Sequence, residues 1–294
     1  MKTNEIMRTV KQQFKAEKVN MGGIVLDQAL PLKGVDQIDP FLLIHHWKST
    51  MKGNQRQQDV GVGPHPHRGF APVTFIFEGA LQHRDSEGHN SIVTKGGTQW
   101  MNSGKGIIHS ERPTKELAKT GGAFEIIQFW VNAPRARKMD RPNYQPLSYD
   151  KMPKLKSSDQ KITVGVVAGS IEDVAGTIDT YSPLLALRLD IEEGGKITLP
   201  VPKHYNAFVY QLDGKSNING AKAGNKELVW FNNDGDTITI EGVESGKAIL
   251  LAGAPINEPV ATYGPFVMNS QAEVMQAIQD YQAGKMGQLN EVFE

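Results

Sequence analysis

Residues 73–77 read VTFIF and are followed by Glu78-Gly79, so a run of β-branched and aromatic residues ends at a glycine. This composition and length are typical of a β-strand that is bounded by a turn. Similar runs occur on both sides of it: IVL (24–26), AFEIIQFWV (123–131), ITVGVVAG (162–169), LLALRLDI (184–191), NAFVYQL (206–212), ELVWF (227–231) and DTITI (236–240). Strands at this spacing predict an all-β sandwich or barrel and argue against βαβ units.

One short helix is expected near the C-terminal end. Ser270 and Glu273 have the spacing of a capping box in front of QAEVMQAIQDYQ, and Gly284 can terminate the helix. The face expected to pack on the β core contains Val274, Met275, Ile278 and Tyr281.

A weak internal repeat divides the chain. His67 is followed by a strand and Glu78-Gly79, and His204 is followed by a strand and Asp213-Gly214. Two similar β-barrels fit this repeat. We expect an N-terminal domain at 1–135, a connecting segment at 136–160, and a degenerate C-terminal domain with the helix at 161–294. The connecting segment is basic and proline-bearing, which is typical of a solvated linker; a docking patch is the alternative.

Composition excludes several classes of protein. The 294 residues carry 32 basic and 32 acidic side chains, so the formal net charge is zero. A broad nucleic-acid surface needs a positive excess, and direct nucleic-acid binding is therefore not expected. Cysteine is absent, which removes disulfides, thiolate zinc sites and cysteine nucleophiles. No apolar run has the length of a membrane span, and we expect a cytoplasmic protein without membrane contact.

The eight histidines are unevenly distributed. Seven precede residue 110, at positions 45, 46, 65, 67, 83, 89 and 109, and only His204 follows. His45 and His46 are adjacent, so at most one of them can face a pocket. His83 and His89 flank RDSEG, which reads as a turn, and are expected to face solvent or to bond within a loop.

Two short motifs remain as candidates for a metal site. VGVGPHPHRGF (60–70) places His65 and His67 two residues apart, and GKGIIHSERP (104–113) does the same for His109 and Glu111. On a strand, such pairs project from one face about 6–7 Å apart. Three imidazoles and one carboxylate suit a divalent first-row metal, and an octahedral ion would keep two positions free. Such open sites suit oxygen chemistry.

The segments DPFLLIHHW, PHPHRGF, EGALQHRDSEGH and TQWMNSGKGIIHSERP resemble the pirin family of the cupin superfamily, as does PFVMNSQAEVMQAIQDYQAGKMG near the end. The resemblance covers roughly residues 20–288. It implies a bicupin: two double-stranded β-helix (jelly-roll) barrels, of which only the first holds a metal. The implied metal ligands are His65, His67, His109 and Glu111. Fe(II) is the expected metal, with Ni, Cu, Co, Mn or Zn as alternatives.

The resemblance implies two different functions. The first is a quercetin 2,3-dioxygenase-like oxidoreductase that acts on a small aromatic chelating substrate and O₂, with Glu111 as the catalytic proton acceptor. The second is a non-enzymatic, iron-dependent redox sensor that binds protein partners. One difference from the family's sequence pattern bears on the choice between these two functions. Many pirins have glutamate directly after the HPHRGF motif, where this chain has Ala71. An auxiliary acid–base role at that position is therefore missing.

Overall fold

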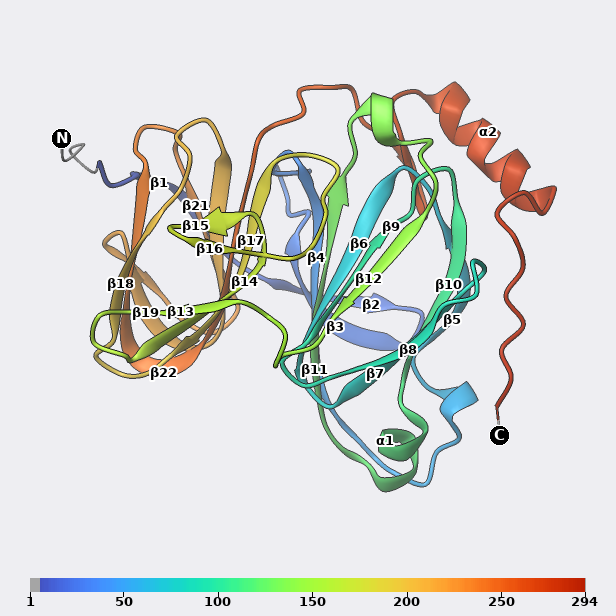
Figure 1. The fold of residues 1–294 in the computed structure, drawn as a ribbon, viewed down its shortest axis with the longest axis horizontal. Coiled ribbons are helices and arrows are strands. Elements are labelled where there is room, and N and C mark those ends of the chain that lie inside the picture. Colours follow the sequence, from blue (N-terminus) through green and yellow to red (C-terminus); the bar gives the residue numbers. More distant parts are fainter. Residues whose placement is uncertain (1–5, 294) are drawn as a thin grey trace. The chain divides into compact units, whose positions relative to one another are not determined.

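The chain folds into two compact units, each assembled from two separate stretches. The computed structural model describes residues 6–293. Unit 1 consists of Met1–Leu42 and Met152–Pro255, and unit 2 consists of Leu43–Lys151 and Ile256–Glu294. Strands dominate both units (Figure 1), so the all-β expectation is confirmed. The domain boundaries expected at 135 and 160 stay a prediction.

Unit 1 is built on one large antiparallel sheet. Its strands follow one another in the order β1 (Val10–Lys15), β21 (Glu227–Phe231), β19 (Asn206–Ile218), β22 (Thr237–Gly253), β17 (Leu184–Ile191), β14 (Ile162–Ala168) and β13 (Lys154–Lys156). In addition, β18 (Lys196–Pro200) pairs with β22, β20 (Ala221–Ala223) with β19, β2 (Glu17–Met21) with β3 (Ile24–Leu30), and β15 (Ser170–Ile171) with β16 (Val174–Ala175). Alternate aliphatic residues of β14 and β17, such as Val164 and Leu187, form the core.

Unit 2 contains two antiparallel sheets. The first has the order β12 (Asn143–Leu147), β9 (Thr98–Asn102), β6 (Phe70–Glu78), β11 (Gly122–Asn132) and β4 (Phe41–Met51). The second has the order β5 (Val62–His67), β10 (Ile107–Pro113), β7 (Ala80–Asp85) and β8 (Asn90–Thr94). The remaining elements are the hairpin β23 (Ala261–Tyr263) and β24 (Phe266–Met268), the helices α1 (Lys115–Thr120) and α2 (Gln271–Gln282), and the 3₁₀ turns η1 (Gln57–Asp59) and η2 (Arg135–Arg137).

The C-terminal helix begins and ends where the sequence predicts. Ser270 accepts a hydrogen bond from the backbone of Glu273 as the N-cap, and Gly284 follows the helix with a φ of 73°. The expected buried face is only partly correct. Val274 and Ala277 are buried, whereas Met275 is 53% exposed and Tyr281 is 39% exposed.

The exposure of Met275 has a geometric cause. One helical residue corresponds to about 100° of rotation, so Met275 points well away from the direction of Val274. The buried face of α2 is therefore narrower than the face expected from its four hydrophobic residues. No helix among residues 6–293 is long and apolar enough to span a membrane.

The segment expected to connect the domains is instead part of the folded structure. It contributes β12 to the sheet beside β9, where Tyr144 and Leu147 are buried. Lys138 is 1% exposed, and its ammonium donates to Gly69 O, Asn132 Oδ1 and Val267 O at 2.7–3.0 Å. A buried cation with three acceptors is a structural anchor and not a residue of a solvated linker.

Candidate metal centre

Two neighbouring strands of unit 2, β5 and β10, carry the predicted ligand pairs. They run antiparallel, with His109 opposite His65 and Ile107 opposite His67. Because side chains alternate along a strand, His65 and His67 project from one face of β5. Strand pairing then brings His109 beside them.

The three imidazoles form a close cluster. One ring nitrogen from each lies within 4.8 Å of those of the other two. The ring centroids are 4.8 Å apart for His65 and His67, 4.4 Å for His65 and His109, and 4.9 Å for His67 and His109. Within residues 6–293, no other group of three or more His, Cys, Asp or Glu side chains is close enough to share a metal ion.

Hydrogen bonds orient the rings so that Nε2 can bind a metal. His65 Nδ1 lies 2.8 Å from Gly63 O, and His67 Nδ1 lies 3.4 Å from Pro265 O. A carbonyl oxygen can only accept, so each Nδ1 carries the proton and each Nε2 keeps its lone pair. The Nε2 atoms of His67 and His109 are buried and have no hydrogen-bond partner. Because buried polar atoms are normally paired, these two atoms fit a metal ion.

The protonation state of the buried rings is also suitable. Burial lowers the pKa of His67 well below the usual value, and the neighbouring His65 lowers it further. Burial has the same effect on the pKa of His109, again assisted by the adjacent imidazoles. Both rings are therefore neutral at pH 7, and neutral imidazole is the form that binds metals.

Glu111, the fourth predicted ligand, lies outside the histidine cluster. Its Oε1 accepts from Thr74 Oγ1 at 2.9 Å and from Gln99 Nε2 at 2.5 Å, and its Oε2 accepts from Gln128 Nε2 at 2.6 Å. Against β5 the register shifts between His109 and Glu111, with the extra residue on β5, whereas β10 pairs regularly with β7 over the same residues. The role of Glu111 as a ligand stays a prediction.

His83 and His89 were expected to face solvent or to bond within a loop, and this expectation is wrong for His83. This ring is 1% exposed on β7, and its Nδ1 lies 3.4 Å from Nδ1 of His109. In the structure Leu81, His83 and Asp85 are buried and alternate with more exposed residues, an alternation that the uniformly polar sequence of residues 82–85 does not reveal. His89 is partly exposed and bonds to Asp85, as expected for a loop residue.

Aromatic side chains lie next to the cluster. The ring of His67 is 5.1 Å from that of Phe70 and 5.6 Å from that of Trp130. Phe70 and Trp130 are in turn 4.4 Å apart. Trp130 is partly exposed and Phe70 is buried. Of the two, only Trp130 has exposed surface beside His67 that a flat aromatic molecule can contact.

Three other residues of the histidine motifs have structural contacts. Arg68 follows His67 directly and pairs with Asp280 of α2 at 2.8 Å, so it binds a carboxylate of the protein. Trp100 and Met101 are 1% and 2% exposed and belong to the core.

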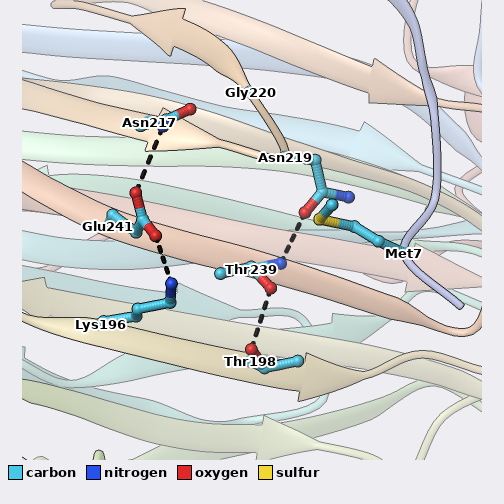
Figure 2. Close-up of a pocket in the computed structure, with 8 residues that line it drawn as sticks. All are labelled: Met7, Lys196, Thr198, Asn217, Asn219, Gly220, Thr239 and Glu241. Atoms are coloured by element: carbon cyan, nitrogen blue, oxygen red, sulfur yellow. Dashed lines mark hydrogen bonds and ion pairs between the residues drawn. The ribbon is translucent and has the colours of Figure 1, made fainter. Parts of the chain in front are cut away.

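A separate polar hollow lies on the sheet of unit 1, with a cavity volume of about 370 Å³ (Figure 2). Its side chains bond chiefly to one another. Lys196 pairs with Glu241 at 2.5 Å, and the hydroxyls of Thr198 and Thr239 are 2.9 Å apart. Because its charges are mutually compensated, we do not assign a reaction to it.

Two family models match the chain. Residues 23–131 match the pirin model, and residues 186–287 match the model of the pirin C-terminal cupin domain. The chain belongs to the pirin family. The bicupin fold expected for a pirin is therefore confirmed.

Relatives of this pirin include plant and bacterial proteins. Pirin-like protein 2 of Arabidopsis thaliana is 34% identical over 287 residues, which cover 95% of this chain and 85% of the relative. A putative quercetin 2,3-dioxygenase of Pseudomonas aeruginosa is 34% identical and covers 84% of this chain and 86% of its own length. The crystal structure of quercetin 2,3-dioxygenase from Acinetobacter baumannii superposes with a TM-score of 0.91 at 32% identity, over 97% of this chain and 100% of the other.

Proposed function

We propose that this chain is a metal-dependent dioxygenase of the quercetin 2,3-dioxygenase type, which acts on a flavonol or a similar aromatic chelating substrate and O₂. The observation that carries the proposal is the pair of buried, unpartnered Nε2 atoms of His67 and His109 beside His65. The bacterial relatives named as quercetin 2,3-dioxygenases support this class of reaction.

The proposed metal is a divalent first-row ion, with Fe(II) first and Ni, Cu, Co, Mn or Zn as alternatives. His65, His67 and His109 would hold it, and Glu111 is the proposed fourth ligand. When bound, such an ion supplies Lewis acidity that lowers the pKa of a substrate hydroxyl.

The protein groups around the histidines have separate tasks in this proposal. Trp130, which is partly exposed, holds an aromatic ring of the substrate beside His67, and the buried Phe70 packs against Trp130. Glu111 accepts the hydroxyl proton on Oε2, the oxygen to which Gln128 donates. The remaining donors, Thr74 and Gln99, keep Oε1 in place while this proton moves.

The alternative is an iron-dependent, redox-sensing regulator that binds protein partners. No specific contact of residues 6–293 favours it, and it stays a prediction, as does the cytoplasmic location. Pull-down from lysate with the reduced and the oxidised iron protein discriminates, because a redox sensor requires partner sets that differ between the two states.

The proposal is tested by aerobic incubation of metal-loaded protein with quercetin. We expect metal-dependent loss of flavonol absorbance, and its abolition in His65→Ala and Glu111→Ala. His204→Ala is the matched control, because it removes a histidine of unit 1 and should keep full activity. Absence of turnover in protein shown to be fully loaded with each of the candidate metals contradicts the proposal.

A further inference from the structure

A chain of hydrogen bonds connects a buried carboxylate to the histidine cluster. Asp85 Oδ2 lies 2.9 Å from Nε2 of His83, and Nδ1 of His83 lies 3.4 Å from Nδ1 of His109. Of the three cluster histidines, His65 and His67 bond to backbone carbonyls through Nδ1, whereas His109 meets a second imidazole. An imidazole nitrogen can donate or accept, so this contact does not by itself fix the tautomer of His109.

Asp85 removes that ambiguity. Burial alone would raise its pKa, but hydrogen bonds from His83 and from the backbone of His89 outweigh burial and hold the pKa below its usual value. A carboxylate can only accept, so Nε2 of His83 must donate to it. With neutral rings, Nδ1 of His83 then accepts from Nδ1 of His109. The lone pair of His109 consequently lies on Nε2, the buried atom without a partner.

The geometry around His83 keeps this arrangement rigid. Its ring stacks on that of Tyr144, with centroids 3.8 Å apart and planes inclined by 4°. The hydroxyl of Tyr144 is held 2.7 Å from Ser91 Oγ. His83 is 1% exposed, so water does not compete for its nitrogens. Because the ring of His83 is held in place, its hydrogen bond to Asp85 sets the tautomer of His83. This tautomer in turn sets the tautomer of His109.

We propose that Asp85, acting through His83, is the positioning residue that presents the Nε2 lone pair of His109 to the metal. This inference rests on the proposed metal site. It assigns a purpose to Asp85 and His83, two buried residues that lie outside the group of three histidines.

The backbone around Asp85 makes Asp85→Asn an informative variant. Oδ1 accepts from the backbone N–H groups of Glu87 and His89, both at 3.0 Å. In the Asp85→Asn side chain, the amide oxygen must therefore take the position of Oδ1, where it accepts from these two N–H groups. The NH₂ group then takes the position of Oδ2 and faces Nε2 of His83. His83 would then accept at Nε2 and carry its proton on Nδ1. The proton of His109 is thereby displaced towards Nε2, where it competes with the metal.

The test combines ¹⁵N NMR of the histidine rings in metal-free protein with Zn(II) and Co(II) affinities from chelator competition. In the wild type we expect the Nδ1–H tautomer for His109 and the Nε2–H tautomer for His83. In Asp85→Asn we expect the opposite tautomer of His83 and an affinity that is lower by about 10–100-fold. His89→Ala is the control: it removes the other imidazole from Asp85 and should keep the wild-type tautomers and an affinity within about twofold.

The outcomes separate this inference from the proposed function. A wild-type His109 with its proton on Nε2, or an Asp85→Asn protein with wild-type affinity, overturns the role of Asp85 and leaves the metal site standing. A wild type that binds neither metal overturns the proposed function. The tautomers of the metal-free wild type decide the role of Asp85 even if Asp85→Asn does not fold.

Discussion

The side-chain amide of Gln99 donates to Oε1 of Glu111 at 2.5 Å, from the strand β9 that packs beside β6. Gln128 and Thr74 complete the set of donors. These three donors fix the orientation of the Glu111 carboxylate, both oxygens of which act as acceptors. In the proposed reaction, this oriented carboxylate accepts a proton from the substrate.

Replacing Glu111 by Gln tests this arrangement. One of its two oxygens becomes an amide group that faces donors, so a buried hydrogen bond is lost. We expect a decrease in the free energy of unfolding of about 1–3 kcal/mol and a loss of dioxygenase activity of about 100-fold or more. Urea denaturation and flavonol turnover measure the two effects. Wild-type turnover in this variant contradicts a catalytic role for Glu111.

Metal removal is expected to destabilise the wild type. A ligand that binds only the folded state stabilises it by about 2.7 kcal/mol at a free concentration of 100 times Kd. A chelator should therefore lower the Tm of the metal-loaded wild type. His67→Ala lacks one of the buried nitrogen ligands, and its Tm should not respond to metal or chelator. An equal response of the two proteins would place the bound metal elsewhere.

Acid should destabilise unit 2 through Glu125. Burial alone would raise the pKa of this carboxyl, but hydrogen bonds from His46 and Lys48 outweigh burial and lower the pKa from 4.5 to about 2. The unfolded chain therefore binds the proton more readily, and the stabilisation is complete above about pH 4.5 and lost as the pH falls towards 2.

Glu125→Gln should flatten this part of the stability profile. The measurement is urea denaturation of metal-free protein between pH 7 and pH 3, and the exposed Glu116→Gln serves as the control. If Glu125→Gln kept the steep wild-type loss of stability below pH 4.5, this carboxylate would not be its source.

Lys138→Met should be strongly destabilising. The variant leaves three buried oxygen acceptors without their donor, and a buried acceptor left unpaired costs about 1–3 kcal/mol. Lys151→Met, an exposed change in the same segment, should alter the free energy of unfolding by no more than about 0.5 kcal/mol. Equal effects of the two changes, measured in urea, would argue that residues 136–160 form a solvated linker after all.

Much of the histidine cluster was predictable because strand periodicity is strict. The two-residue spacing of His65 and His67 determines their common face, and the motif at His109 supplies a second strand. His83 and Asp85 were missed because RDSEG reads as a turn that begins before Asp85, whereas β7 extends through this residue.

The division into units was harder to predict for a different reason. Strand pairing is not local: β1 pairs with β21, with Val10 opposite Phe231. Similarly, the buried Arg68 binds Asp280, more than 200 residues away along the chain. Local composition carries no information on such partners, and it also gave no sign that Lys138 is buried.

In the proposed function, the three histidines hold a metal ion on which flavonol dioxygenase activity depends. The most direct measurement is quercetin consumption by Fe(II)-loaded wild type and His109→Ala, in air and under anaerobic conditions, with the bound metal quantified in each sample. The account predicts consumption only by metal-loaded wild type in air. Fully loaded wild type that leaves quercetin unchanged, or equal consumption by metal-free His109→Ala, would contradict it.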